Sequence, residues 1–350
     1  MKDEKFCILI MAGGKGTRFW PKSTEAKPKQ FLKLTSDKTM IQLTIERSKQ
    51  IVPMERIFVV TGEKYKEILK EQIPDMEDKN IIVEPTGRNT APCIALATMY
   101  INQIYNNSNI AVLPSDHLII DEEEFKNTIL AGNKFINSNG KKGIVTIGVK
   151  PNRVETGYGY IKIDKKIDDL KSRVIKVEKF VEKPDFDLAL HYLETKMYLW
   201  NAGMFIFNSN YMEKEIKKQI PSIYDIIYNL PKIDSDDFKE KLAETYINCE
   251  EISIDYAIME KCNDIYVIPS SFGWDDIGTW RSIERYTKKD ENKNIIKGNA
   301  ELVDSTNCVV YGNGKRIVAI NVEDIYIIDG DDAIVVCNKE KIDSVKKYRK

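Results

Sequence analysis

The chain has 350 residues, of which 42% are hydrophobic and 31% are charged, enough for a large domain and a smaller one. Its 53 lysines and arginines almost balance its 54 aspartates and glutamates, which removes any overall electrostatic reason to bind nucleic acid or an anionic membrane. No apolar run reaches the length of a membrane span, and only a short stretch precedes the first glycines. We therefore expect neither a membrane helix nor a secretory signal, and we predict a cytoplasmic protein.

Short apolar runs alternate with amphipathic stretches through the first part of the chain. The predicted elements, in order, are strand 6–11, helix 39–51, strand 57–61, helix 64–72, strand 80–84, helix 91–105, strand 109–116, helix 122–137 and strand 142–149. This alternation predicts an α/β fold with a Rossmann-like, mostly parallel sheet covered on both faces. Such sheets bind ligands beyond the carboxyl ends of their strands. The polar loops after the first, third and fourth strands are therefore expected on one rim.

The second part of the chain has a different pattern. Residues 151–280 combine hairpin-like pieces with helices, which is typical of a substrate-binding insertion. The polar stretch YTKKDENKN then predicts a domain boundary. Short strands separated by turn residues follow it. We interpret residues 288–350 as a small β module resembling a left-handed β-helix, closed by a helix near 340–348, and residues 1–287 as the main domain.

Cysteine and histidine are too few and too scattered for several common chemistries. The six cysteines contain no CxxC pair, and several lie in apolar runs, so we interpret them as reduced core thiols and not as zinc ligands. Only two histidines are present, His117 and His191, which leaves little material for a histidine-rich metal site or a Ser-His-Asp triad. The chemistry must therefore rest on carboxylates, lysines and arginine.

The stretch ILIMAGGKGTRFWP sets an apolar strand directly against a glycine-rich turn. Gly13, Gly14 and Gly16 have no side chains, so backbone N–H groups can approach an anion closely. Arg18 adds a planar donor fork suited to phosphate oxygens. A tight turn without a ligand is the alternative. The stretch is not a P-loop, and Phe19 stands where a dinucleotide fingerprint needs its third glycine, which excludes a dehydrogenase.

The segment AGGKGTRFWP, together with KPKQFLKL, resembles the signature of sugar-nucleotide pyrophosphorylases. Further motifs are similar to those of mannose-1-phosphate guanylyltransferases: EPTGRNTAP, LPSDH, ETGYGYI, FVEKP, WNAGMFIFN, SIDYAIMEK and GWDDIGTW. The resemblance runs from the first strand to the final helix and implies the short, single-activity form, without the sugar-isomerase domain of longer bacterial members. It implies a nucleotidyltransferase domain over residues 1–287, GTP and mannose 1-phosphate as substrates, and a homodimer through the β module.

In the implied reaction, a phosphate oxygen of mannose 1-phosphate attacks the α-phosphorus of GTP and pyrophosphate leaves. Because two polyanions must meet, positioning and charge neutralisation should outweigh proton transfer. The resemblance implies that Arg18 and Lys29 bind the triphosphate and stabilise the leaving pyrophosphate. It implies that Lys183 draws the sugar phosphate toward the α-phosphorus. We interpret Lys27 as a solvated surface lysine.

Two aspartates are the predicted metal ligands. A carboxylate beside phosphates repels them unless a hard cation lies between, which favours Mg²⁺ held by carboxylates, phosphate oxygens and water. The resemblance places the metal ligands at Asp116 and Asp276. Asp275 is the rival, because neighbours on an extended segment cannot both point the same way. The other aspartate of this pair is then expected to be a helix N-cap before Gly278.

The EPTGRNTAP motif supplies the candidate nucleotide-binding residues beyond the glycine loop. Glu84 can accept both donors on the Watson–Crick edge of guanine, with recognition by the backbone as the alternative. Arg88 is a candidate for a phosphate at a helix N-terminus. Asn89 and Thr90 are candidates for nucleotide binding whose alternative role is to cap that helix.

Three further residues match family positions that bind mannose hydroxyls: Gly157, Glu182 and Asn201. Because Glu182 adjoins Lys183, both can serve one site only if the turn before Pro184 re-aims them. Three tryptophans are expected to pack around the sugar pocket: Trp200, Trp274 and Trp280.

Two alternative functions stay open. One is a guanylyltransferase for another manno-configured sugar 1-phosphate, such as a heptose. The other is a non-catalytic sensor of nucleotide sugars. The full set of cations and metal carboxylates argues against the sensor, because binding alone does not need leaving-group cations.

Overall fold

The computed structural model describes residues 5–14, 16–169 and 173–349. The chain forms two compact units, each assembled from separate stretches of sequence. Unit 1 comprises Met1–Gly13, Ile45–Ser115 and Ile119–Trp274, and unit 2 comprises Gly14–Thr44, Asp116–Leu118 and Asp275–Lys350. The chain therefore leaves and re-enters each unit, and the residues after the first strand and the fourth strand belong to unit 2.

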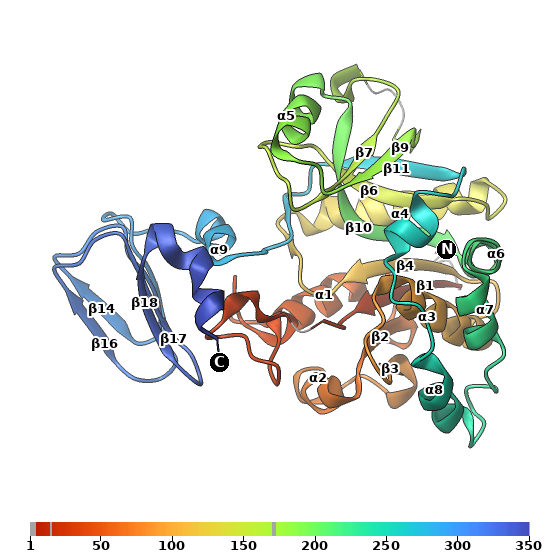
Figure 1. Ribbon diagram of the computed structural model, residues 1–350, viewed down its shortest axis with the longest axis horizontal. Helices are drawn as coiled ribbons and strands as arrows, with labels where there is room; N and C mark the ends of the chain where they lie inside the picture. The colour runs from red at the N-terminus through yellow and green to blue at the C-terminus, as the bar shows by residue number, and fades with distance from the viewer. Residues whose placement is uncertain (1–4, 15, 170–172, 350) are drawn as a thin grey trace. The chain divides into compact units, whose positions relative to one another are not determined.

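A large mixed sheet forms the centre of unit 1, and its strands follow the order β3-β2-β1-β4-β10-β6-β11-β8 (Figure 1). The first four are mutually parallel, as the alternation of strands and helices predicts: β1 (Phe6–Met11), β2 (Ile57–Gly62), β3 (Ile81–Glu84) and β4 (Asn109–Pro114). Met11 lies opposite Pro114, and Gly62 lies opposite Glu84. The carboxyl ends of these strands therefore share one rim, which confirms that prediction.

Helices connect these strands at the predicted places. They are α1 (Met40–Lys49), α2 (Lys66–Gln72), α3 (Thr90–Ile104) and α4 (Glu122–Ser138). The strongly apolar α3 is buried along most of its length and contributes to the main core of unit 1. The more amphipathic α4 begins with three acidic residues and is capped by the Asp121 side chain, which accepts from Glu124 N at 2.9 Å. In the described part of the chain, no helix is both long and apolar enough to cross a membrane.

Among the described residues, the region predicted as an insertion contributes five strands to the central sheet, and two of them lie on either side of β6. β10 (Tyr198–Asn208) runs antiparallel between β4 and β6 (Ile144–Val149), and β11 (Ile265–Ser270) runs parallel to β6. The end of β10 is a continuous apolar run that is buried on both faces, as a central strand requires. The segment 151–280 is therefore not wholly an insertion, because part of it completes the central sheet.

The other three strands of this region extend the same sheet. β7 (Gly159–Lys162) pairs antiparallel with β10 and with β9 (Lys179–Glu182), whereas the short β8 (Ile175–Lys176) pairs with β11. The helices of this part are α5 (Phe186–Thr195), α6 (Ser209–Gln219), α7 (Pro221–Tyr228), α8 (Phe238–Tyr246) and the π-helix η7 (Asp255–Met259). Figure 1 shows α6, α7 and α8 following one another in green to teal.

Two small sheets of short strands make up the C-terminal part of unit 2. One contains β13 (Ile295–Lys297), β15 (Val309–Tyr311), β17 (Ile325–Asp329) and β18 (Ile334–Asn338), and the other contains β14 (Ala300–Val303) and β16 (Ile317–Ile320). Neighbouring strands within each sheet are parallel, as in the coils of a β-helix, except that β17 and β18 are antiparallel. Apolar side chains fill the space between the two sheets. The predicted last helix is present as a 3-10 helix, η8 (Lys339–Tyr348).

A second core joins this β module to the segment that follows the glycine loop. Phe19, Trp20 and Met40 lie in one apolar cluster with Trp280 of α9 (Trp280–Tyr286) and Tyr326 of β17. The Trp20 indole donates to Asp332 at 3.0 Å, and the Lys22 ammonium donates to the Gly312 carbonyl at 3.1 Å. The N-terminal and C-terminal parts of unit 2 therefore fold as one body.

The tryptophans differ in part from the prediction. Trp280 belongs to the core of unit 2, where its ring lies 5.3 Å from Phe19 and 5.1 Å from Tyr311, so the expectation that it packs around a sugar pocket is wrong. Trp280 is the first residue of α9 and lies on the buried side of this helix, which packs in the core of unit 2. In unit 1, Trp200 and Trp274 both contact Tyr158, at 5.4 and 5.1 Å.

Candidate active site

The glycine-rich turn is shaped by two close approaches. In unit 2, Gly16 has a φ of +45°, and a Cβ there would lie 2.6 Å from Lys29 N and 3.0 Å from Lys29 Cβ. In unit 1, a Cβ on Gly13 would lie 3.4 Å from a carboxylate oxygen of Glu84. Gly14 has a φ of +120° and open space where a Cβ would point. Within unit 2, Gly16 thus admits Lys29 and Gly14 leaves backbone accessible to a ligand, whereas within unit 1 Gly13 admits Glu84.

Four of the predicted site residues meet in unit 2. Lys29 is buried, and its ammonium donates to Asp116 Oδ2 at 2.9 Å and to the backbone oxygen of Asp276 at 2.5 Å. Arg18 and the Asp276 carboxylate both lie beside Gly278, where a Cβ would be 3.4 Å from Arg18 Nη1 and 3.1 Å from Asp276 Oδ2. Lys27, by contrast, is exposed, as predicted. One lysine therefore holds two acidic segments together, with an arginine next to them.

Positive charge keeps Asp116 ionised. Burial by itself raises the pKa of this carboxyl group, but Lys29 first, and then His117 and Arg18, outweigh it and hold the pKa below its usual value. His117 is thus an electrostatic neighbour of Asp116. An ionised carboxylate at this position can bind either a lysine or a metal ion.

Asp275 and Asp276 have different surroundings. Asp275 is completely buried and accepts from Ile277 N at 2.8 Å, Arg285 Nη2 at 2.8 Å and the Tyr286 hydroxyl at 3.0 Å. The bonds to Arg285 and Tyr286 hold the segment that contains Asp275 against α9. The predicted aspartate N-cap is wrong, because Thr279 caps α9 and forms a capping box with Ser282. The N-cap lies three residues after Asp276 and four after Asp275, once the chain has passed Gly278.

The aspartates of unit 2 suit a magnesium ion. Lys29 bonds to the Asp116 carboxylate and to the Asp276 backbone oxygen, and the Asp276 carboxylate lies beside Gly278 near Arg18, so both aspartates belong to one charged region of unit 2. Among the described residues, no group of three or more histidine, cysteine or acidic side chains could hold a metal by itself. A pair of carboxylates that leaves other positions to phosphate and water is the donor set that Mg²⁺ prefers. The residues therefore fit a metal that arrives with a phosphate ligand.

In unit 1, Glu84 lies at the end of β3 and is only 6% exposed. The Tyr246 hydroxyl donates to its Oε1 at 2.5 Å, and the Cys93 thiol also donates to this carboxylate. Burial raises the pKa of Glu84 to about 6, although both donors lower it. Its remaining oxygen faces Gly13. Glu84 is therefore a carboxylate held rigidly against the beginning of the glycine turn.

The other predicted nucleotide residues are bonded within unit 1. Arg88 donates to the backbone oxygen of Ile247, at the end of α8. Asn89 has a φ of +67° and caps α3, because its side chain accepts from Thr90 N at 2.8 Å. The Thr90 hydroxyl accepts from Ile254 N at 2.8 Å. The capping role, which the sequence left as an alternative, is thus realised by Asn89.

The predicted sugar residues form a second cluster in unit 1. Lys183 has a φ of +46°, which breaks the strand alternation and lets its ammonium pair with Glu182. The backbone therefore re-aims these neighbours, as the prediction required. Asn201 donates to Asp255 Oδ1 at 2.9 Å and accepts from Gly203 N at 3.1 Å. Gly157 lies apart from these bonds and donates to Glu155 at 3.2 Å.

Asp255 is a member of this cluster that the sequence reasoning did not single out. Burial, followed by the negative charge of Glu182, raises its pKa to about 6. It begins the π-helix η7, a rare geometry that recurs at functional sites. Asp255 lies in the motif SIDYAIMEK. The sequence feature that could have identified it is an acidic residue directly before an apolar helical turn.

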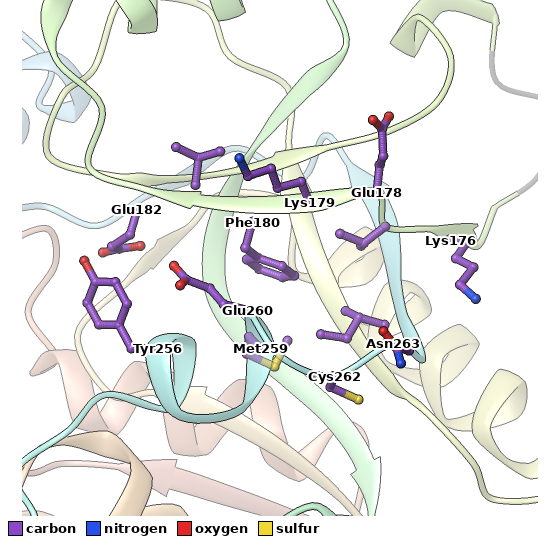
Figure 2. Close-up of a pocket in the computed structure, with 13 residues that line it drawn as sticks. Lys176, Glu178, Lys179, Phe180, Glu182, Tyr256, Met259, Glu260, Cys262 and Asn263 are labelled. Atoms are coloured by element: carbon purple, nitrogen blue, oxygen red, sulfur yellow. The ribbon is translucent and has the colours of Figure 1, made fainter. Parts of the chain in front are cut away.

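A cavity of about 690 Å³ lies between β9 and η7, and Glu182 is part of its lining. Figure 2 shows Glu182 and Tyr256 turned toward each other at one end, with Phe180 and Glu260 further along. Its apolar rings and carboxylates are side chains that commonly bind hydroxyl-bearing ligands. Glu182 thus belongs both to the polar cluster and to this cavity.

A glycine turn, paired cations, two metal-type carboxylates and a parallel sheet together define a phosphate-transfer enzyme of the nucleotidyltransferase class. Residues 8–293 match the family model described as nucleotidyl transferase, and residues 298–348 match the model described as a MannoseP isomerase/GMP-like beta-helix domain. The chain belongs to the nucleotidyl transferase family. These matches confirm the family recognised in the sequence motifs, the fold class and the β-helix-like nature of the C-terminal strands.

Curated relatives resemble nearly the whole chain. A mannose-1-phosphate guanylyltransferase of Salmonella montevideo is 37% identical over 346 residues, which cover 97% of this chain and 72% of the relative. The alginate biosynthesis protein AlgA of Pseudomonas aeruginosa is 37% identical over 342 residues, which cover 97% of this chain and 70% of the relative. Both relatives are therefore longer than the chain described here.

A solved structure from Thermus thermophilus, described as a mannose-1-phosphate geranyltransferase, superimposes with a TM-score of 0.85. It is 31% identical in sequence, and the match covers 98% of each chain. A structure from Helicobacter pylori described as a mannose-6-phosphate isomerase is 25% identical, with a TM-score of 0.62, over 77% of this chain and 99% of that one.

Proposed function

We propose that the protein transfers the guanylyl group of GTP to mannose 1-phosphate, forming GDP-mannose and releasing pyrophosphate. The observation that carries this proposal is Lys29, whose ammonium binds Asp116 and the Asp276 backbone with Arg18 close by. The names of the curated relatives support the choice of donor and acceptor. A binding protein would not need this concentration of cations beside two acidic residues.

In the proposed reaction, a phosphate oxygen of mannose 1-phosphate forms a bond to the α-phosphorus of GTP. The bond from that phosphorus to the oxygen that bridges the α- and β-phosphates breaks, and its electron pair leaves with that oxygen on pyrophosphate. Arg18 and Lys29 neutralise charge on the triphosphate and the leaving group, while backbone around Gly14 binds its oxygens. Lys183 draws in the sugar phosphate. No side chain needs to exchange a proton with either substrate.

Members of this family generally use a divalent metal, and we propose Mg²⁺ held by Asp116 and Asp276. When bound, the metal neutralises phosphate charge that the two carboxylates would otherwise repel. Lys29 keeps Asp116 ionised and positions it for this role. The bonds that occupy the buried Asp275 support Asp276 as the ligand.

The substrate contacts in unit 1 follow the same proposal. Glu84 reads guanine or orients the glycine turn, and Asn89 and Arg88 shape the loop that follows it. Mannose hydroxyls bind Glu182 and Asn201, together with backbone at Gly157 and the carboxylate of Asp255. The side chains of Asn201 and Asp255 are already hydrogen-bonded to each other, which fixes the direction of their other polar atoms.

Three broader expectations remain predictions. The catalytic domain spans residues 1–287, and residues 288–350 form a module that makes a homodimer. The protein works in the cytoplasm, a location favoured by cysteines that form no disulfide among the described residues. It binds neither nucleic acid nor membrane.

The test is pyrophosphate release with Mg²⁺ across a grid of nucleotides and sugar phosphates. GTP, ATP, UTP and CTP are each paired with mannose 1-phosphate, glucose 1-phosphate and a heptose 1-phosphate. The proposal expects strong release for GTP with mannose 1-phosphate alone. Release only with the heptose would keep the mechanism and change the acceptor, whereas tight GTP binding without release anywhere would reassign the protein as a sensor.

A further inference from the structure

A short stretch after α8 touches both predicted substrate-binding regions of unit 1. It runs from Tyr246, the last residue of α8, to Asp255, the first residue of η7. We call residues 246–255 the strap. None of its residues is among the predicted site residues, and the proposed function assigns a role only to its last residue, Asp255.

The strap is hydrogen-bonded along the predicted nucleotide loop, residues 84–91. Near its beginning, the Tyr246 hydroxyl donates to Glu84, and the next residue, Ile247, accepts from Arg88 through its backbone oxygen. Near its end, the Ile252 backbone oxygen accepts from Ala91 N at 3.1 Å, and Ile254 N donates to the Thr90 hydroxyl at 2.8 Å. These four bonds pair the two segments from end to end.

The last residue of the strap belongs to the sugar cluster. Asp255 accepts from Asn201 at 2.9 Å, and Glu182 lies close enough to raise its pKa. Only one peptide bond separates Asp255 from Ile254, whose N–H is bonded to the nucleotide loop. A shift of the loop therefore reaches the sugar cluster through a single residue.

We propose that the strap positions the nucleotide loop and the sugar cluster relative to each other, and that Tyr246 is a positioning residue that sets the Glu84 carboxylate against the glycine turn. The inference rests on the proposed function for its substrates. Tyr246 is completely buried, so its hydroxyl can orient Glu84 without touching either substrate. Gly13 has no side chain at the point where the other Glu84 oxygen arrives, which leaves the carboxylate in contact with the turn.

The environment of Glu84 provides a readout that a purely structural tyrosine would not change. The titratable groups that face Glu84 are Tyr246 of α8, Cys93 of α3 and Cys249 of the strap, with Arg88 acting on Cys249. Burial raises the pKa of Glu84 to about 6, and the Tyr246 hydrogen bond opposes that rise. Loss of this bond moves the pKa further up, so Glu84 becomes neutral at a higher pH.

The experiment compares Tyr246→Phe with Tyr228→Phe in the full chain. Tyr228 is a half-buried tyrosine of α7 whose buried hydroxyl has no hydrogen-bond partner among the described residues, so its replacement controls for the loss of a buried oxygen. GTP affinity is measured by calorimetry without sugar phosphate, and kcat and KM for both substrates are measured from about pH 5.5 to 8.5, a range that spans the raised carboxyl pKa. Circular dichroism melts establish that the variants fold.

For Tyr246→Phe we expect the Kd and KM for GTP to rise about tenfold, the effect of losing one bond to a buried carboxylate. We also expect the acid limb of the GTP affinity to move to higher pH. Tyr228→Phe should change neither. Unchanged GTP affinity and an unchanged acid limb in folded Tyr246→Phe would overturn the role of Tyr246. If that variant does not fold, Cys93→Ala removes the other donor to Glu84 and must produce the same two effects.

The link to the sugar cluster is tested with Thr90→Val, which removes the acceptor of Ile254 N while keeping the side-chain shape. We expect KM for mannose 1-phosphate to rise about threefold or more, together with KM for GTP. A rise for GTP alone would overturn the link. If the wild-type protein binds GTP but releases no pyrophosphate, the proposed function fails, while the calorimetric comparison still decides the role of Tyr246.

Discussion

At the scale of single residues, neighbours in sequence have opposite roles. Asp275 is completely buried and bonded to Ile277, Arg285 and Tyr286, whereas Asp276 lies beside Arg18 and Gly278. An extended backbone sends adjacent side chains in opposite directions, so one aspartate braces α9 and the other faces the cations. If this segment were shifted by one residue, Asp275 would face the cations and Asp276 would contact α9.

This contrast predicts different outcomes for two substitutions. Asp276→Asn should lower kcat for pyrophosphate release by about 100-fold or more and leave the thermal melt unchanged, because it removes charge from a metal ligand. Asp275→Asn should lower stability by about 1 to 3 kcal/mol, because it weakens bonds to Arg285 and Tyr286 in a buried site. Kinetics and melting of both variants check this. Full activity of Asp276→Asn would show that a residue other than Asp276 binds the metal.

Glu84 carries a prediction about base selection. Glu84→Gln keeps the shape of the side chain but replaces one acceptor oxygen with a donor, so a carboxylate that reads guanine N–H groups should lose this function. We expect KM for GTP to rise at least tenfold, with KM for mannose 1-phosphate little changed. Competition between GTP and ATP measures the outcome. An undiminished preference for GTP would assign recognition to the backbone of the loop.

At the scale of elements, the site depends on where strands and helices begin and end. The nucleotide loop follows β3, Asn89 caps α3, and the sugar cluster joins the end of β9 to the start of η7. These junctions carry free backbone groups and unusual torsion angles such as the φ of +46° at Lys183. Functional side chains therefore gather at element boundaries, where regular side-chain alternation ends.

The first turn of η7 predicts a dependence of stability on pH. The pKa of Asp255 is raised from 3.8 to about 6, so this group favours the folded state fully below its unfolded pKa, and that contribution is lost as the pH rises through 6. The side chain introduced by Asp255→Asn does not ionise, so its burial does not become less favourable as the pH rises. The stability of this variant relative to the wild type should therefore increase by about 1 kcal/mol between pH 5 and pH 7.5 in urea titrations. A relative stability independent of pH would contradict the raised pKa.

At the scale of the whole molecule, the β module shares a core with the segment that carries Arg18 and Lys29, the proposed catalytic cations. Phe19 and Trp20 adjoin Arg18 in the sequence and pack in unit 2 with Tyr326 and Ile328 of the module. Gly330 lies so close to Pro21 that a Cβ would overlap backbone atoms of Pro21. The module therefore supports the glycine turn from within the same unit.

The contact between Gly330 and Pro21 makes this support testable. Gly330→Ala should lower stability by about 1 to 3 kcal/mol, because backbone must move to admit the methyl group, and it should lower kcat by displacing Arg18. Gly312→Ala is the matched control in the same module, where the nearest atom to a new Cβ is 3.3 Å away. Melting and kinetics of both variants provide the check. If the two variants had the same stability and the same kcat, the β module would have no influence on catalysis.

The sequence by itself determined the main strands and helices of the first 149 residues and the rim on which their loops meet, and it supplied the proposal of which residues bind phosphate. It could do so because hydrophobic periodicity, glycine turns and cationic motifs act over short stretches. The tertiary structure alone decided which residues meet. Lys29 reaches Asp116 across 87 residues and Asp276 across 247, and no local pattern encodes that distance. It also decided that β10 enters the central sheet, that Trp280 turns toward the β module, and that the strap joins Glu84 to the sugar cluster, since each outcome depends on packing between segments remote in sequence.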